Sequence, residues 1–116
     1  MATKLRVGIV GCGLIGQKRA RGLGGLGTVV ACADLDERRA RSFGSMFEVP
    51  MVTTSWQAVA ESPEVDVVVV ATTNDALAPV AALAARNGKA VLVEKPAARS
   101  VAEIDTVIAA AEKGGA

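Results

Sequence analysis

The sequence contains no histidine and no tyrosine, and only 3% of its residues are aromatic. Two of the side chains that most often act as general acids and bases are therefore absent. The formal net charge is +1, so electrostatics gives no reason to expect a nucleic acid or a membrane surface as partner. Apolar runs such as residues 67–71 are far too short to cross a bilayer.

Cysteine is scarce as well, and Cys12 and Cys32 do not have the spacing of a metal or redox pair. No apolar leader segment precedes residue 5, so we expect a reduced, cytoplasmic setting. Hydrophobic residues, by contrast, make up 51% of the 116 residues. That length predicts one globular domain, residues 1–116.

Short apolar runs alternate with segments of helical periodicity, a pattern typical of β-α-β units around a parallel sheet. The run at 65–71 is nearly all β-branched, which predicts a strand covered by helices on both faces. Right-handed crossovers then predict a doubly wound α/β sheet, a Rossmann fold, with strand order 3-2-1-4-5. The predicted strands lie near 5–10, 28–33, 49–52, 65–71 and 89–93, and the helices near 14–25, 36–46, 55–61, 76–87 and 100–113.

Polar residues mark the ends of these helices. Asp36 is a candidate N-cap for the second helix, and Asn74 or Asp75 for the fourth. Asn87-Gly88 places a glycine where the fourth helix needs a left-handed residue. Two capping boxes are predicted, Thr54 with Gln57 for the third helix and Ser100 with Glu103 for the fifth.

No sixth strand follows the fifth helix, so we expect the fifth strand to be an open edge. A second copy of the chain or a missing substrate domain is the expected cover for that edge.

The first strand leads directly into the pattern G-x-G-x-x-G, at Gly11, Gly13 and Gly16. Gly11 allows a tight turn off the strand, and Gly13 removes a side chain that would block a diphosphate. Gly16 lets the next helix approach the sheet, with its N–H groups and dipole facing the anion. Because an acidic residue, Asp34, ends the second strand about 20 residues later, the pattern predicts a dinucleotide site.

Asp34 also bears on which dinucleotide binds. A carboxylate there accepts hydrogen bonds from the ribose hydroxyls and repels a 2′-phosphate, which favours NAD over NADP. Arg38 and Arg39 follow one turn into the helix and could reach a 2′-phosphate if Asp34 turned away. NADP therefore stays open as an alternative cofactor. A simple helix-initiating role is the other reading of Asp34.

Polar residues also follow the fourth and fifth strands, at the sheet edge where ligands bind in α/β folds. Thr72, Thr73 and Asn74 offer hydroxyl, amide and backbone donors, although a turn with a helix cap would use the same residues. Glu94-Lys95-Pro96 places a lysine that can polarise a carbonyl or hold a hydroxyl, although an exposed charged turn has this composition too.

Three other side chains have a structural interpretation. Cys12 lies between two glycines, as a small residue tolerated beside a phosphate, and the sequence supplies no base to activate its thiol. Cys32, inside the second strand, is predicted to be core, and Trp56 a packing anchor.

The segments 7–16, 30–36, 65–74 and 88–96 together resemble the Gfo/Idh/MocA oxidoreductases, in order and spacing. The resemblance covers essentially the whole chain and implies an NAD(P)-dependent enzyme acting on sugars, inositols or related polyols. It implies that the three glycines hold the pyrophosphate and Asp34 the adenosine ribose. Thr72, Asn74 and Glu94 would lie on the nicotinamide side, and Lys95 would reach the substrate as the catalytic candidate. The predicted cofactor-binding residues are Gly11, Cys12, Gly13, Leu14, Ile15, Gly16, Asp34, Leu35, Arg39, Thr72, Thr73, Asn74, Glu94 and Lys95.

The chain departs from the family at Thr73, where a proline is usual, and at Leu77, where a histidine is usual. The family's second domain, which covers the nicotinamide and brings proton-transfer groups, is absent from these residues. We therefore expect cofactor binding without efficient turnover. Two alternatives are a nucleotide-sensing module without catalysis, like the regulatory domains of potassium transport systems, and a fragment that keeps the fold but little affinity.

Overall fold

The computed structural model describes residues 5–72 and 74–93, with the backbone alone described at 74–77 and 93. Five parallel strands form one sheet in the order β3-β2-β1-β4-β5, which confirms the predicted topology. The elements are β1 (Leu5–Val10), α1 (Leu14–Gly22), β2 (Gly27–Ala33), α2 (Glu37–Phe47), β3 (Met51–Thr53), α3 (Trp56–Glu61), β4 (Val67–Val70), α4 (Asn74–Arg86) and β5 (Ala90–Val93).

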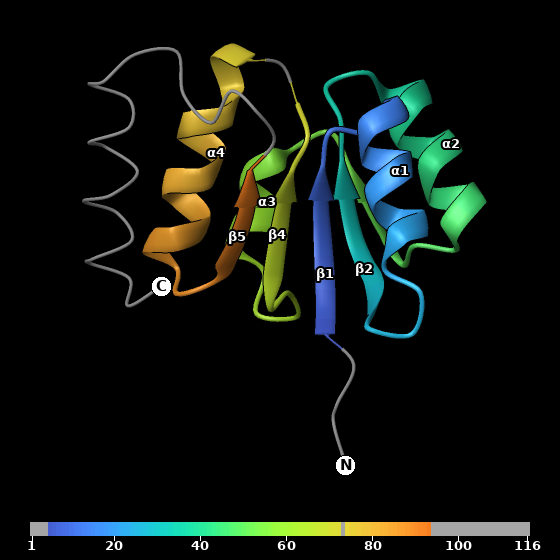
Figure 1. Cartoon of the computed structure of the whole chain (residues 1–116). Coiled ribbons are helices and arrows are strands. Elements are labelled where there is room, and N and C mark those ends of the chain that lie inside the picture. The colour runs from blue at the N-terminus through green and yellow to red at the C-terminus, as the bar shows by residue number, and fades with distance from the viewer. Residues whose placement is uncertain (1–4, 73, 94–116) are drawn as a thin grey trace.

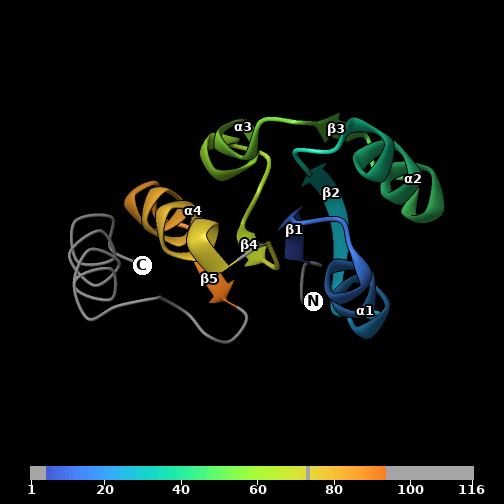
Figure 2. The ribbon, with the colours of Figure 1, turned by 90° about the horizontal axis from the view of Figure 1, so that it is seen from above.

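Helices cover both faces of the sheet, with α1 and α2 on one face and α3 and α4 on the other (Figures 1 and 2). Successive valines of β4 therefore point into different cores. Val68 and Val70 are buried against Val59 of α3 and Val80 of α4. Val69 faces the opposite core, which includes Phe43 of α2. Burial on both faces explains why this strand is uninterrupted and β-branched.

Several predicted element boundaries were wrong by a few residues. β4 is shorter than 65–71, because its register with β1 pairs only Val67 to Val70. α1 ends at Gly22 rather than near residue 25, and Gly24 follows with a left-handed φ of 53°. β3 covers 51–53 rather than 49–52, and α4 begins at Asn74 rather than near 76.

The capping predictions had different outcomes. Asp36 caps α2 and accepts hydrogen bonds from the N–H groups of Arg38 and Arg39, as predicted. The Thr54 box on α3 is wrong, because the cap is Ser55, whose hydroxyl accepts from the N–H of Ala58 at 3.3 Å. Thr54 and Ser55 both carry a hydroxyl that could cap the helix. Because Val59 and Ala60 pack in the core against the sheet, the helix begins at Trp56 and Ser55 becomes the cap.

After α4, Gly88 has a φ of 75°, which confirms the left-handed glycine expected there. The predicted helix at 100–113, with its Ser100–Glu103 box, lies outside the described residues. Within the part of the chain that is described, no helix is both long and apolar enough to span a membrane.

Candidate functional site

Several of the predicted dinucleotide-binding residues, among them Gly11, Asp34 and Thr72, meet where β1, β2 and β4 end, at the upper edge of the sheet in Figure 1. Parallel strands bring their carboxyl ends to one edge, so residues more than 50 positions apart become neighbours. A cavity of about 360 Å³ opens there, within the size range of small-molecule sites. Its lining includes Gly11, Gly13, Asp34, Leu35, Asp36, Arg39, Ala71 and Thr72.

The three glycines of the loop meet different local surroundings. Gly11 has a φ of 103°, and a Cβ on it would stand 2.3 Å from the carbonyl oxygen of Ala71. A Cβ on Gly16 would stand 2.0 Å from the carbonyl oxygen of Gly11. A Cβ on Gly13, by contrast, would meet no atom within 4 Å. The fold itself therefore requires the outer two glycines, whereas Gly13 keeps a space open.

Gly13 is also the N-cap of α1, and it provides no side-chain hydrogen bond to that helix end. The first turn of α1 carries no acidic residue either. This helix terminus, whose Gly13 lines the cavity, therefore has no capping side chain of its own, and the positive end of the helix dipole lies there. This arrangement suits an anionic ligand.

The Asp34 carboxylate is held by the backbone on both sides. Its Oδ2 accepts the N–H of Cys12 at 2.8 Å, and its Oδ1 accepts the N–H of Asp36 at 2.8 Å. The side chain is only 9% exposed, and the Arg39 guanidinium lies 3.8 Å from Oδ2. Asp34 thus joins the glycine loop to the turn between β2 and α2.

The Cys12 side chain points away from the cavity, into the core between the sheet and helices α1 and α2. Its thiol donates to the carbonyl oxygen of Ala33 at 3.4 Å, and Cys32 is buried in the same cluster. A hydrogen bond with Cys32, together with burial, raises the pKa of the Cys12 thiol far above its ordinary range. The thiol stays neutral, so Cys12 serves the site through its backbone N–H.

Sequence reasoning missed several lining residues. A small cavity of about 40 Å³ beside Asp34 is bordered by Thr54, Trp56 and Val80 as well as by Leu35 and Thr72. Trp56 packs against the core, as predicted, and borders this cavity too. Its place directly after β3, at the same carboxyl edge, was the available signal.

Other predicted residues lie at the rim or outside the described part. Leu35 is 82% exposed where it borders both cavities, and Leu14 and Ile15 are exposed at the start of α1. Asn74 begins α4, and the structure describes only the backbone of Asn74 and Leu77. Thr73, Glu94 and Lys95 lie outside the described residues.

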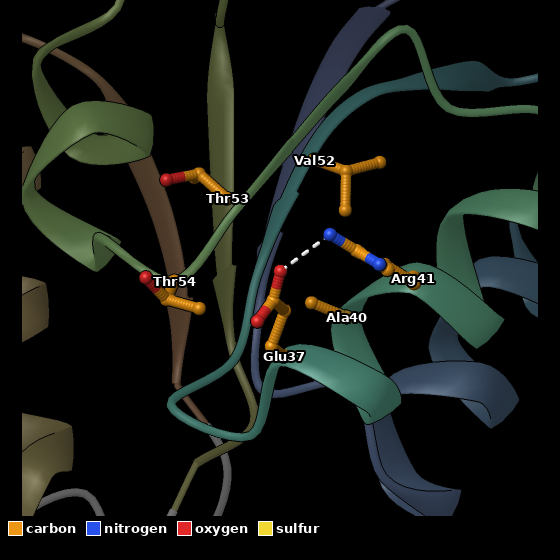
Figure 3. A pocket seen from close by; sticks show the side chains of 6 residues that line it. All are labelled: Glu37, Ala40, Arg41, Val52, Thr53 and Thr54. Carbon is orange, nitrogen blue, oxygen red and sulfur yellow. Dashed lines mark hydrogen bonds and ion pairs between the residues drawn. The ribbon is translucent and has the colours of Figure 1, made fainter.

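A second cavity, of about 370 Å³, lies between α2 and β3 (Figure 3). Figure 3 shows Arg41 and Glu37 joined by a hydrogen bond, with the Val52 side chain on the same side of the strand and the Thr53 side chain pointing the other way. Both charged side chains are largely exposed and neutralise each other. This cavity is not the better candidate, because its described lining includes neither the glycine loop nor the start of α1.

A metal centre gains no support from the described residues, which contain no group of three potential histidine, cysteine or carboxylate ligands.

Known proteins share both the sequence pattern and the fold. A family model described as the oxidoreductase family, NAD-binding Rossmann fold, matches residues 5–116. Mouse trans-1,2-dihydrobenzene-1,2-diol dehydrogenase is 36% identical in an alignment of 115 positions that covers 96% of this chain and 34% of that protein. Inositol 2-dehydrogenase of Acidothermus cellulolyticus is 36% identical in an alignment of 123 positions, gaps included, that covers 99% of this chain and 35% of that protein.

Among solved structures, GenD2 from gentamicin A biosynthesis, in complex with NAD, superposes with a TM-score of 0.89 at 32% identity. The match covers 99% of this chain and 33% of GenD2. The chain thus spans about a third of the length of the relatives that it matches.

Proposed function

The chain belongs to the Gfo/Idh/MocA oxidoreductase family as its NAD-binding Rossmann domain, and from this premise we propose that it serves an enzyme oxidising or reducing a sugar, inositol or related polyol. The proposal draws on relatives that are dihydrodiol and inositol dehydrogenases. The cofactor-binding part of this proposal rests on one observation. Gly13, at the start of α1, faces open space beside the cavity that Asp34 lines.

The described residues fit a nicotinamide dinucleotide. The diphosphate would lie against Gly13 and the amide groups that begin α1, where a Cβ would stand in open space. The adenosine ribose would bind Asp34, whose carboxylate is already oriented by the N–H groups of Cys12 and Asp36. Leu35 and Thr72 would border the bound cofactor, as members of the same cavity lining.

When bound at Gly13 and Asp34, a nicotinamide dinucleotide would supply hydride-transfer chemistry toward a carbinol or carbonyl carbon of the substrate. From the family resemblance we propose that Glu94 would contact the nicotinamide ribose region and that Lys95 would handle the hydroxyl proton. A catalytic site also needs walls that exclude water, and the relatives have about two thirds of their length beyond the matched region. We therefore propose that these 116 residues bind cofactor without efficient turnover.

Calorimetric titration of the 116-residue chain with NADH tests this proposal. The wild type should bind saturably, and Gly13→Val should weaken binding on the order of 100-fold, because a side chain then occupies the diphosphate position. Gly25→Val is the matched control: Gly25 also faces open space, but on the loop between α1 and β2, at the opposite edge of the sheet.

Equal affinities of the Gly13 and Gly25 variants would refute the proposed diphosphate position. Failure of the folded wild type to bind either NADH or NADPH would refute cofactor binding by this chain. Rapid reduction of NAD⁺ by the isolated chain with myo-inositol would refute the claim that turnover needs further residues.

A further inference from the structure

One methionine lies half exposed at the end of the helix layer that α1 and α2 form on one face of the sheet. Met46, in the last turn of α2, is 50% exposed. Met51, in β3, is partly buried and packs against the hydrophobic core. An oxidant in solution therefore reaches the sulfur of Met46 more easily than that of Met51.

The Arg21 guanidinium lies against the Met46 sulfur. Its Nη2 donates a hydrogen bond to Sδ at 3.4 Å, so the last turn of α1 contacts the last turn of α2. The same guanidinium stands 5.7 Å from the ring centroid of Phe47, within cation–π range. The Phe47 ring packs in turn on the buried Phe43, with 4.7 Å between the centroids. Arg21 is therefore held beside the sulfur by a side chain that is anchored in the core.

This arrangement suits the oxidised form of the methionine better than the reduced form. A thioether sulfur is a weak hydrogen-bond acceptor. Oxidation to the sulfoxide makes the side chain polar and adds an oxygen bonded directly to the sulfur. That oxygen would form beside a cationic donor that already stands 3.4 Å from the sulfur, and charge-assisted hydrogen bonds are stronger than neutral ones.

We propose that Met46 is a site of oxidation by peroxides, and that Arg21 binds the sulfoxide that forms. The sulfur attacks one oxygen of hydrogen peroxide, and the S–O bond forms as the O–O bond breaks. The departing oxygen takes the proton of the transferred oxygen and leaves as water, so the sulfur loses the two electrons that the peroxide gains. Oxidation of a packed methionine ordinarily disrupts its contacts, whereas here Arg21 preserves the contact between α1 and α2.

The site is separate from the proposed cofactor cavity. Helices α1 and α2 begin beside that cavity, at the caps Gly13 and Asp36, whereas Arg21 and Met46 lie in their last turns. At the rise of an α-helix this is a separation of about 12 Å or more. The inference therefore goes beyond the proposed function and does not depend on it.

The test treats the 116-residue chain with hydrogen peroxide and locates the added oxygen by peptide mass spectrometry. Met46 should be oxidised more than about threefold faster than Met51. Urea unfolding, followed by circular dichroism, then compares the treated and untreated proteins. The wild type should keep its unfolding midpoint, whereas the midpoint of Arg21→Gln should fall by about 0.3–0.5 M on oxidation, because the new oxygen then lacks its charged donor.

Two further variants serve as controls. Lys18→Gln removes another exposed positive charge from α1 and leaves Arg21 beside Met46, so it should behave as the wild type does. Met46→Leu, treated in the same way, measures the change caused by oxidation elsewhere in the chain, which is subtracted. Equal oxidation rates at Met46 and Met51 would overturn the proposed site. Equal midpoint changes in the wild type and in Arg21→Gln, whatever their size, would overturn the role of Arg21.

Discussion

Replacing Gly16 with alanine should destabilise the domain through one contact. The added Cβ would stand 2.0 Å from the carbonyl oxygen of Gly11, whereas ordinary contact begins near 3.4 Å. Helix α1 and the glycine loop would have to separate by more than an ångström. Overpacking of this kind costs about 1–3 kcal/mol, and up to about 1 kcal/mol is returned by the helix propensity of alanine. With the full return, we expect a net loss of up to about 2 kcal/mol.

Gly22→Ala is the control for this prediction, because Gly22 lies in the same helix and a Cβ there would meet nothing within 4 Å. Both variants make the same chemical change, so the difference between them isolates the contact with Gly11. Urea unfolding followed by circular dichroism measures the free energy of unfolding of each variant. If Gly16→Ala proved as stable as Gly22→Ala, the argument that helix–loop packing requires Gly16 would be refuted.

Two further predictions concern positions outside the site. Glu48 ends α2 with a φ of 54°, so Glu48→Gly should be more stable than Glu48→Ala by about 1 kcal/mol in urea unfolding; equal stabilities would contradict the strain argument. The Arg6 guanidinium is hydrogen-bonded to Asp66 and holds the pKa of that carboxyl below its ordinary value. The stabilisation of the fold by the ionised Asp66 is therefore present above about pH 4 and is lost as the pH falls through the lowered pKa. Asp66→Asn should therefore lose less stability than the wild type on acidification from about pH 5 to 2, and parallel losses would argue against this pair.

The sequence by itself determined the architecture. Its alternating periods gave five strands and their order, and the β-branched run of β4 indicated a sheet buried on both faces, as the two cores confirm. It also indicated the cap at Asp36 and the left-handed Gly88. These features depend on residues close in the sequence, or on rules of chain connection that hold for any β-α-β fold.

Tertiary structure alone decided how the site is assembled. Three features of the site depend on the directions that side chains take once the strand register is fixed. They are the hydrogen bond from Cys12 to Asp34, the ion pair of Asp34 with Arg39, and the position of Trp56 beside the small cavity. The cap at Ser55 rather than Thr54 was likewise decided when α3 packed on the sheet. The glycine pattern predicted a separate role for each glycine, and the structure added the contacts behind those roles: a Cβ would collide with backbone at Gly11 and Gly16 but would meet open space at Gly13.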